Sequence, residues 1–273
     1  MKKTILFFII LTFITWVPSA SAQDDTLLQV RDRHVFEVGP EMFFMHYKEP
    51  GLMKNEGMMY GGVINYQYRN TVMIGLENRF AGGAVDYESH NTGSSDNNGD
   101  FLYEGRLLLG ADLKAEKFAV IPFIGFGYRY LYDDSSGSQT TTGAGGYQRE
   151  SNYFYSPLGM AIEYYLNEEW TLDLKGEYDL FWGGVQRSLL GDALAGHPTV
   201  YNDQDFVDGS GFKLSGGVAC RIKKIIVKLT AFYHYWRIGD SDTDSVFWNG
   251  ANRTYIEPRN RSQELGGRLS VLF

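Results

Sequence analysis

The stretch Trp170-Thr-Leu-Asp-Leu-Lys-Gly-Glu-Tyr-Asp-Leu-Phe-Trp182 decides the fold. Its even-numbered positions are apolar or aromatic apart from one glycine, whereas its odd-numbered positions are mainly charged. Successive side chains of a β-strand point to opposite faces, so this alternation predicts a strand with one apolar and one ionic face. Soluble sandwiches and membrane barrels both contain such strands. The lengths of the connections between strands therefore have to distinguish a soluble sandwich from a membrane barrel.

The same alternation recurs from about residue 34 onward and predicts ten strands. The predicted strands are 34–47, 58–69, 72–89, 101–114, 118–133, 151–166, 170–186, 210–222, 225–238 and 263–273. Short connections alternate with long, polar ones. The short ones are 70–71, 115–117, 167–169 and 223–224, and the long ones are 48–57, 90–100, 134–150, 187–209 and 239–262. This pattern is typical of an all-β, transmembrane, antiparallel up-and-down β-barrel with short periplasmic turns and long extracellular loops.

The N-terminus has the features of a secretory signal peptide. Lys2 and Lys3 precede an apolar run over 5–17, and small residues follow up to Ala22. The run of 13 residues is short for a membrane-spanning helix. We therefore expect cleavage after Ala22 and export of the remaining chain.

The predicted organisation has three parts. They are a cleaved signal peptide over 1–22, a periplasmic N-terminal segment over 23–33 and the transmembrane β-barrel domain over 34–273. Ten strands enclose only a narrow lumen.

Composition excludes several other classes of protein. Beyond the first residues, no apolar run approaches the roughly 18 residues of a helical span, so a polytopic helical membrane protein is excluded. A net charge of −8 without a Lys/Arg cluster argues against nucleic-acid binding. Cys220 is the single cysteine, so it forms no internal disulfide and no thiolate metal cage. We expect no cofactor.

The apolar faces of the predicted strands satisfy the demands of a bilayer. Every backbone group in hydrocarbon must be paired, which a closed barrel achieves. The apolar faces carry no ionisable group except tyrosine, and aromatic residues such as Tyr128 and Trp182 lie toward the long loops. Tyr66 and Trp170 lie toward the short turns, which gives two aromatic girdles. Ser156, on the nominal outer face of the sixth strand, fits this pattern least well.

The opposite faces carry nearly balanced charge, with ten acids and eight bases. They are Glu37, Glu41, Glu77, Arg79, Glu104, Arg106, Asp112, Arg129, Glu163, Asp173, Lys175, Glu177, Asp179, Lys213, Arg221, Lys228, Glu264 and Arg268. Charges away from water are tolerated when they are paired and hydrogen-bonded, so we expect a salt-bridge network that fills the lumen. A conducting pore with charge selectivity is the alternative.

The C-terminal strand carries a family resemblance. Leu265, Gly267, Leu269, Val271 and the terminal Phe273 share one face. This strand resembles the last strand of Gram-negative outer-membrane proteins, which implies that the outer-membrane assembly machinery reads Leu269, Val271 and Phe273 during insertion.

Three internal segments resemble the small outer-membrane β-barrel domain proteins of the opacity and porin-like families. These segments are 125–130, 149–155 and 235–242. The resemblance implies a ten-stranded barrel in the outer membrane, in contact with its lipids and lipopolysaccharide. We expect a monomer.

Two enzyme families with barrel folds were compared with the chain. Ten strands and about 250 exported residues resemble the omptin proteases, whose site pairs two aspartates with an Asp–His couple. None of the candidates His90, His197 and His234 has the Asp-x-His spacing, so no omptin residue is carried over. The spacing from His234 to Ser241 also differs from the His-x-Ser pattern of lipid A deacylases. We predict no catalytic residue.

Asp240, Asp242 and Asp244 have the alternating rhythm that opens a calcium loop. The twelfth position is Ala251 instead of glutamate, so this is no EF-hand and at most a weak divalent-ion candidate beside a solvated acidic loop. Arg253, Arg259 and Arg261 are candidate partners for lipopolysaccharide phosphates in the same loop.

The function predicted from the sequence is that of an integral, non-enzymatic outer-membrane protein. Its role would lie in envelope integrity or in surface binding through the loops, which carry aromatic residues such as Tyr201 and Phe247. A narrow pore for ions or small solutes is the first alternative, and an enzyme at the barrel rim is the second.

Overall fold

The structure, a computed structural model, describes residues 33–273. The predicted signal peptide and nearly all of the predicted periplasmic segment lie outside the described residues. The strands are β1 (His34–Glu49), β2 (Met53–Arg69), β3 (Val72–Ser89), β4 (Gly93–Ala111), β5 (Leu113–Lys114), β6 (Phe118–Asp134), β7 (Gln148–Tyr165), β8 (Trp170–Leu189), β9 (Val200–Gln204), β10 (Gly209–Ile222), β11 (Ile225–Ile238), β12 (Thr243–Trp248), β13 (Ala251–Ile256) and β14 (Asn260–Leu272). One 3₁₀ turn, η3 (Leu190–Asp192), interrupts them. Within the described range, no helix is long and apolar enough to cross a membrane.

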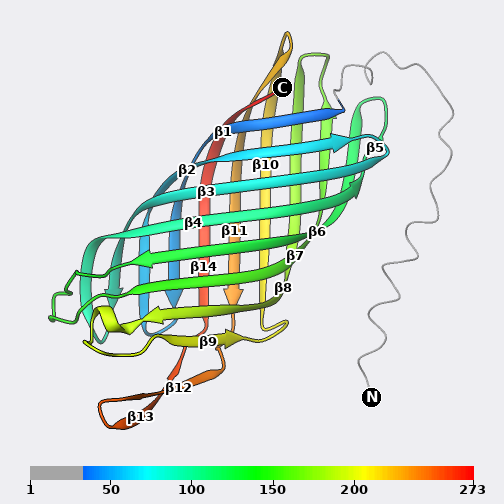
Figure 1. Cartoon of the computed structure of the whole chain (residues 1–273). Coiled ribbons are helices and arrows are strands. Elements are labelled where there is room, and N and C mark those ends of the chain that lie inside the picture. The colour runs from blue at the N-terminus through cyan, green and yellow to red at the C-terminus, as the bar shows by residue number, and fades with distance from the viewer. Residues whose placement is uncertain (1–32) are drawn as a thin grey trace, which may run out of the picture. The chain divides into compact units, whose positions relative to one another are not determined.

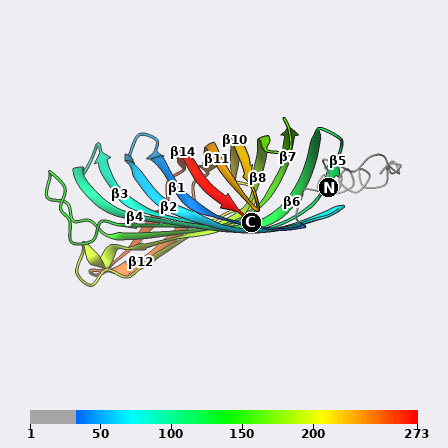
Figure 2. The same cartoon turned by 90° about the horizontal axis from the view of Figure 1, so that it is seen from above.

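Ten long strands form a closed antiparallel barrel, which confirms the predicted fold class. The strands pair in sequence, and β14 lies between β11 and β1. β8 pairs with β10 and closes the ring, while β9 pairs with the last residues of β8. Figure 1 shows the long strands side by side, and Figure 2 shows β14 next to β1.

All ten predicted strands are present, but two of the predicted long loops are wrong. Only residues 50–52 connect β1 to β2, and only residues 90–92 connect β3 to β4. The strands continue through the polar residues that the prediction assigned to loops, and Lys54 and Glu88 are cross-strand partners there. A strand with polar side chains on both faces looks like a loop in the sequence. Backbone pairing nevertheless extends these two hairpins beyond the part of the wall whose outer face is apolar.

The barrel has two distinct ends. The turn end carries the start of β1, the end of β14 and the short connections around residues 70, 116, 167 and 223. The loop end carries η3, β9 and the separate hairpin β12–β13. Asn249 and Gly250, with φ of 52° and 79°, form the two-residue turn of this hairpin, and Asn-Gly suits such left-handed positions.

The outer face is apolar over the middle of each strand. Large exposed side chains include Met42, Leu107, Leu229 and Leu265. Ser156 is buried despite its outer parity, and it lies beside a register shift in which Phe154 pairs with Gly183 but Tyr155 pairs with Phe181. The extra residue of this bulge is Trp182.

The interior contains apolar clusters on both sides of a charged layer. Along β3, Met73 belongs to a cluster near the turn end with Leu108, Ile121 and Phe123. Glu77 and Arg79 follow, and Ala81 and Val85 then belong to a cluster near the loop end. A third cluster near the loop end contains Tyr153, Tyr155, Phe181, Trp236 and Ile238.

Candidate functional site

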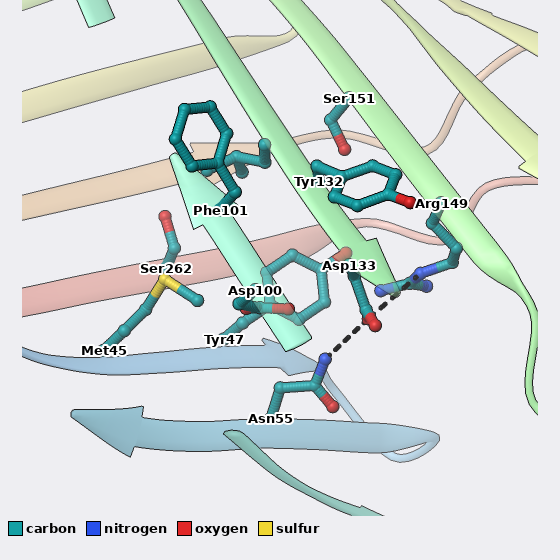
Figure 3. A pocket seen from close by; sticks show the side chains of 11 residues that line it. Met45, Tyr47, Asn55, Asp100, Phe101, Tyr132, Asp133, Arg149, Ser151 and Ser262 are labelled. Carbon is teal, nitrogen blue, oxygen red and sulfur yellow. Dashed lines mark hydrogen bonds and ion pairs between the residues drawn. The ribbon is translucent and has the colours of Figure 1, made fainter. Parts of the chain in front are cut away.

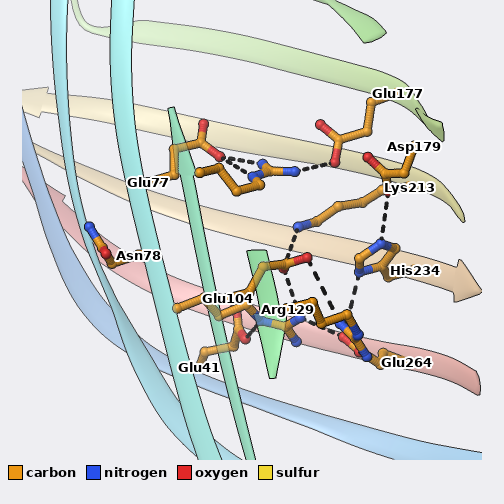
Figure 4. A network of polar contacts seen from close by, with 12 residues as sticks. Glu41, Glu77, Asn78, Glu104, Arg129, Glu177, Asp179, Lys213, His234 and Glu264 are labelled. Atoms are coloured by element: carbon orange, nitrogen blue, oxygen red, sulfur yellow. Dashed lines mark hydrogen bonds and ion pairs between the residues drawn. The ribbon is translucent and has the colours of Figure 1, made fainter. Parts of the chain in front are cut away.

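The charged layer in the middle of the lumen is built around two arginines. Arg79 on β3 donates from Nε to Glu41 and from Nη1 to Glu264 Oε2 at 2.5 Å. Arg129 on β6 donates from Nη2 to Glu264 Oε1 at 2.6 Å. Both arginines also lie within 3.9 Å of Glu104. Figure 4 shows Glu41, Glu104, Arg129 and Glu264 close together.

A second group continues the layer toward β8. Arg106 on β4 donates to Glu77 and Glu177. Lys175 Nζ donates to Glu77 Oε1 at 3.0 Å, and Lys213 Nζ lies 3.9 Å from Glu104 Oε2. Lys213 is also the cross-strand partner of Glu177, so it connects the two groups (Figure 4).

His234 completes the layer on β11. Its Nε2 lies 3.2 Å from Asp179 Oδ2, and its Nδ1 lies 3.8 Å from Glu264 Oε2. The Tyr155 hydroxyl donates to Glu104 Oε1 at 2.6 Å. The five side chains named in this paragraph are buried, so their polar groups are separated from bulk water, and Glu104 and Glu264 each have several partners.

The remaining predicted lumen residues lie nearer the turn end. Arg268 donates to Glu41 Oε2 at 2.6 Å, and Lys228 Nζ lies 2.6 Å from Asp173 Oδ1. Glu37 accepts hydrogen bonds from Ser270 and Asn65. Arg221 has no ion pair among the described residues.

Sequence reasoning missed Arg69, which joins Asp112 and Glu163 at the turn end. Its Nε and Nη2 donate to Asp112 at 3.1 Å, and its Nη1 donates to Glu163 at 2.7 Å. Arg69 lies on the same face of β2 as the buried residues Val63 and Asn65. This strand parity predicts that Arg69 faces the lumen. Because Arg69 is the last residue of the strand and adjoins a turn, the sequence pattern is weak at this position.

Aromatic side chains cover the layer toward the loop end. The guanidinium carbon of Arg79 lies 4.4 Å from the ring centroid of Phe43 and 5.1 Å from that of Phe232. Trp236 and Tyr155 make an edge-to-face contact with centroids 5.0 Å apart. Arg79 therefore contacts aromatic rings as well as carboxylates.

A second polar cluster lies at the loop end around Arg149. Its Nη1 donates to Glu49 Oε1 at 2.7 Å and lies 3.8 Å from Glu257 Oε1, while its Nε lies 3.7 Å from Asp133 Oδ2. Asp133 is the cross-strand partner of Asp100. Figure 3 shows Asp100, Asp133 and Arg149 lining one small pocket. Its volume is about 30 Å³.

Burial changes the ionisation of two loop residues near this cluster. Burial raises the pKa of Glu257 to about 7, the Arg149 charge opposes this rise, and Glu49 adds to it. Burial likewise raises the pKa of Tyr147 to about 12, again against Arg149. The cluster has four carboxyl groups around one arginine, so a protonated Glu257 reduces their mutual repulsion.

The three aspartates of the calcium-like rhythm do not converge. Asp240 Oδ1 accepts a hydrogen bond from the backbone of Arg259, and Asp244 Oδ2 accepts one from the backbone of Tyr201. The backbone N–H of Asp242 donates to Asp203. Among residues 33–273, no group of three or more His, Cys, Asp or Glu side chains is arranged to hold a metal ion.

The three candidate histidines lie in different parts of the structure. His197 Nε2 lies 2.6 Å from the Tyr255 hydroxyl, and its ring packs at a tilt against Trp248, with 4.7 Å between centroids. His234 is buried in the lumen layer, whereas the Ser241 hydroxyl donates to the Asp242 carbonyl in a loop. His90 is exposed beside a turn.

Polar and cation–π contacts hold the β12–β13 hairpin, whereas several loop aromatics stay exposed. The Asn202 side chain donates to the carbonyls of Asp242 and Tyr255 at 3.1 Å each. The Arg253 guanidinium lies 5.2 Å from the Trp248 ring, so this arginine packs on the hairpin itself. Phe206 and Phe247 remain largely exposed.

The C-terminal residues close the seam of the barrel. Leu269 and Phe273 are exposed on the outer face, together with part of Val271. The backbone of Phe273 exchanges two hydrogen bonds with Phe36, at 2.9 and 3.0 Å.

Comparison with solved structures places the chain among outer-membrane β-barrels. It superposes on the outer membrane protease OmpT from Escherichia coli with a TM-score of 0.56 and 9% identity, covering 88% of this chain and 96% of OmpT. The translocator domain of the autotransporter NalP from Neisseria meningitidis gives 0.45 and 10% identity over 89% of each chain. Neisserial surface protein A gives 0.30 and 12% identity over 87% of this chain and 95% of that one.

No family model and no curated protein matches the sequence. The similarity to OmpT therefore establishes the outer-membrane β-barrel fold alone. The similarity to OmpT gives no catalytic role to the histidines or lumen residues named from the sequence.

Proposed function

We propose that this protein is a monomeric integral protein of the outer membrane with a closed lumen, whose loop end binds partners at the cell surface or supports envelope integrity. Export through residues 1–22 and insertion through Leu269, Val271 and Phe273 belong to this proposal. The long loops would then face the outside of the cell, as in other barrels of this fold.

The observation that carries the proposal is the sealed charged layer. Arg79 and Arg129 are 5% and 0% exposed and are held by Glu41, Glu104 and Glu264. Aromatic rings cover them toward the loop end. A conducting pore needs ion sites that water can reach, so this arrangement supports a closed lumen.

The loop end supports a binding role because it contains paired strands rather than only irregular loops. β9 pairs with the last residues of β8. Hydrogen bonds of Asn202 and Asp244 join the β12–β13 hairpin to β9. Phe206 is 65% exposed and Phe247 is 67% exposed on this structured end. Exposed aromatic side chains on a rigid base suit contact with another molecule.

Single-channel recording in planar bilayers tests the closed lumen. We expect no discrete current from the refolded protein, with heat-modifiable migration showing that the barrel has formed. A 16-stranded porin in the same bilayers shows that the recording detects channels. Discrete currents from the wild type that change when Arg129 or Glu177 is neutralised would instead support the pore alternative.

The orientation and the binding role are tested separately on whole cells. A protease site inserted between Asn249 and Gly250 should be cleaved from outside intact cells, whereas a site between Lys223 and Lys224 should be protected. Replacement of residues 243–256 by a two-residue turn should leave the barrel folded and weaken surface binding or envelope resistance to detergent. Unchanged behaviour of that variant in both assays would contradict a role for the loop end.

A further inference from the structure

Three basic residues lie side by side on the outer wall near the loop end. Arg237 on β11 is the cross-strand partner of Arg261 on β14, and Arg261 is the partner of Lys48 on β1. We call these three residues the cation row. Neighbouring strands lie about 4.8 Å apart, so the row spans roughly 10 Å between its outer Cα atoms.

All three side chains point away from the lumen. Each is exposed, while its chain neighbours are buried inside the barrel, as Trp236 and Ile238 are on either side of Arg237. The same alternation holds for Asn260 and Ser262 around Arg261. The row therefore faces whatever surrounds the barrel.

The cation row has no counterion among residues 33–273. In the part of the chain that the structure describes, none of the three residues makes an ion pair. The next residue across the sheet, Lys54, is paired with Glu56 at 3.2 Å and Glu88 at 3.1 Å. On the far side of the barrel, Arg187 is paired with Glu150 at 3.2 Å.

Three adjacent unpaired cations are unusual in a chain whose net charge is −8. Like charges on neighbouring strands repel each other when nothing neutralises them. An anion bound across the three strands removes this repulsion. Two guanidinium groups and an ammonium group match phosphate oxygens, since arginine binds phosphate through two parallel hydrogen bonds.

His46 and Gln263 lie directly beside the cation row, and beyond them the surface toward the turn end is apolar. Leu265 and Leu269 follow Arg261 on the same face of β14, and Leu265 is 65% exposed. Phe44 and Met42 precede Lys48 on β1 in the same way, and both are exposed. A ligand that fits the whole region has phosphate at one end and hydrocarbon at the other.

We propose that the cation row binds the phosphate groups of a phosphorylated membrane lipid, whose acyl chains lie along β14 and β1. The site is separate from the lumen and from the β12–β13 hairpin. It goes beyond the proposed function, because a lipid site on the wall requires neither a closed lumen nor a binding role of the loops.

The test measures lipid binding to the chain refolded in uncharged maltoside micelles. The probes are bisphosphorylated lipid A, the same lipid without phosphates, and inorganic phosphate. The row variant is Lys48→Gln/Arg237→Gln/Arg261→Gln. The control variant, Lys117→Gln/Lys223→Gln/Lys224→Gln, removes three exposed cations at the turn end and so has the same net charge.

We expect wild type and control to retain the bisphosphorylated lipid equally in native mass spectrometry. The row variant should bind it at least about tenfold more weakly, because each charge-assisted hydrogen bond lost costs roughly a factor of ten. The lipid without phosphates should bind all three proteins weakly. Heat-modifiable migration must show a folded barrel for each, and Arg261→Gln alone replaces the row variant if that variant does not fold.

Three results would overturn the proposal. Equal binding by the row variant and wild type would exclude the row as the site. Equal weakening of row and control variants would show a bulk-charge effect. If inorganic phosphate binds the row as tightly as the lipid does, the acyl chains contribute nothing and the ligand is a free anion.

Discussion

Replacement of Glu264 by glutamine tests the charged layer most directly. Glu264 is 1% exposed, and its two carboxylate oxygens accept hydrogen bonds from Arg79 at 2.5 Å and Arg129 at 2.6 Å. Glutamine has nearly the same shape but no charge, and its amide nitrogen places a donor against one of the two guanidinium groups. The change therefore removes the shared counterion while leaving the packing in place.

The expected cost follows from what remains around the two arginines. Arg79 keeps Glu41, whereas the nearest carboxylate left to Arg129 is Glu104 at 3.9 Å. Removal of one partner from a buried ion pair destabilises a protein by about 3–5 kcal/mol. We expect Glu264→Gln to lower the free energy of unfolding by that amount, measured by reversible urea unfolding in lipid vesicles.

Glu88→Gln is the matched control for this measurement. Glu88 is 66% exposed and pairs with Lys54 at 3.1 Å, so its loss should cost at most about 1 kcal/mol. If Glu264→Gln is no more destabilising than Glu88→Gln, the lumen layer does not hold the barrel together as described here. A conductance that appears in Glu264→Gln alone would, in contrast, show that the layer is the seal.

Two further changes test the interior at other levels. The pKa of Glu257 is raised to about 7 from 4.5, so the folded state holds this proton more tightly, and the contribution of Glu257 to stability should fall by roughly 3 kcal/mol as pH rises from about 4.5 to 7. Glu257→Gln should remove most of that slope between pH 5 and 7.5 in urea unfolding curves, and an unchanged slope would contradict the assignment. A Cβ at Gly127 would clash with the Tyr155 ring, so Gly127→Ala should cost about 1–3 kcal/mol by overpacking, whereas Gly176→Ala, where the nearest atom to the new Cβ lies 4.0 Å away, should leave the packing of the lumen unchanged. Equal melting temperatures of Gly127→Ala and wild type would refute the first part.

The sequence was sufficient to predict the barrel because a bilayer and a packed lumen impose opposite demands on alternate residues. The stretch 170–182 shows this alternation through the whole depth of the wall, and β8 begins where it was predicted. Alternation loses its meaning beyond the apolar belt, where both faces of a strand are polar. For this reason the sequence pattern predicts loops where the structure has extended hairpins that end at 50–52 and 90–92.

The lumen contacts illustrate the same limit. Strand parity assigns Arg79 and Glu264 to one surface, but their contact depends on which strands face each other across the barrel and at which height. The loop-end cluster was harder to predict, since Glu49, Arg149 and Glu257 come from three distant places in the chain. Glu257 lies outside the strands altogether, so no periodicity marks it.

The seam between β1 and β14 joins the beginning of the barrel to its end. Glu41 and Arg268 are 227 residues apart in the sequence, and Arg79 and Glu264 are 185 apart. A nascent or truncated chain that lacks β14 therefore presents Glu41, Arg79 and Arg129 without their last counterions, beside an unpaired strand edge. β14 supplies both the pairing partner for that strand edge and the missing counterions. Closure of the barrel is therefore unfavourable until β14 is present.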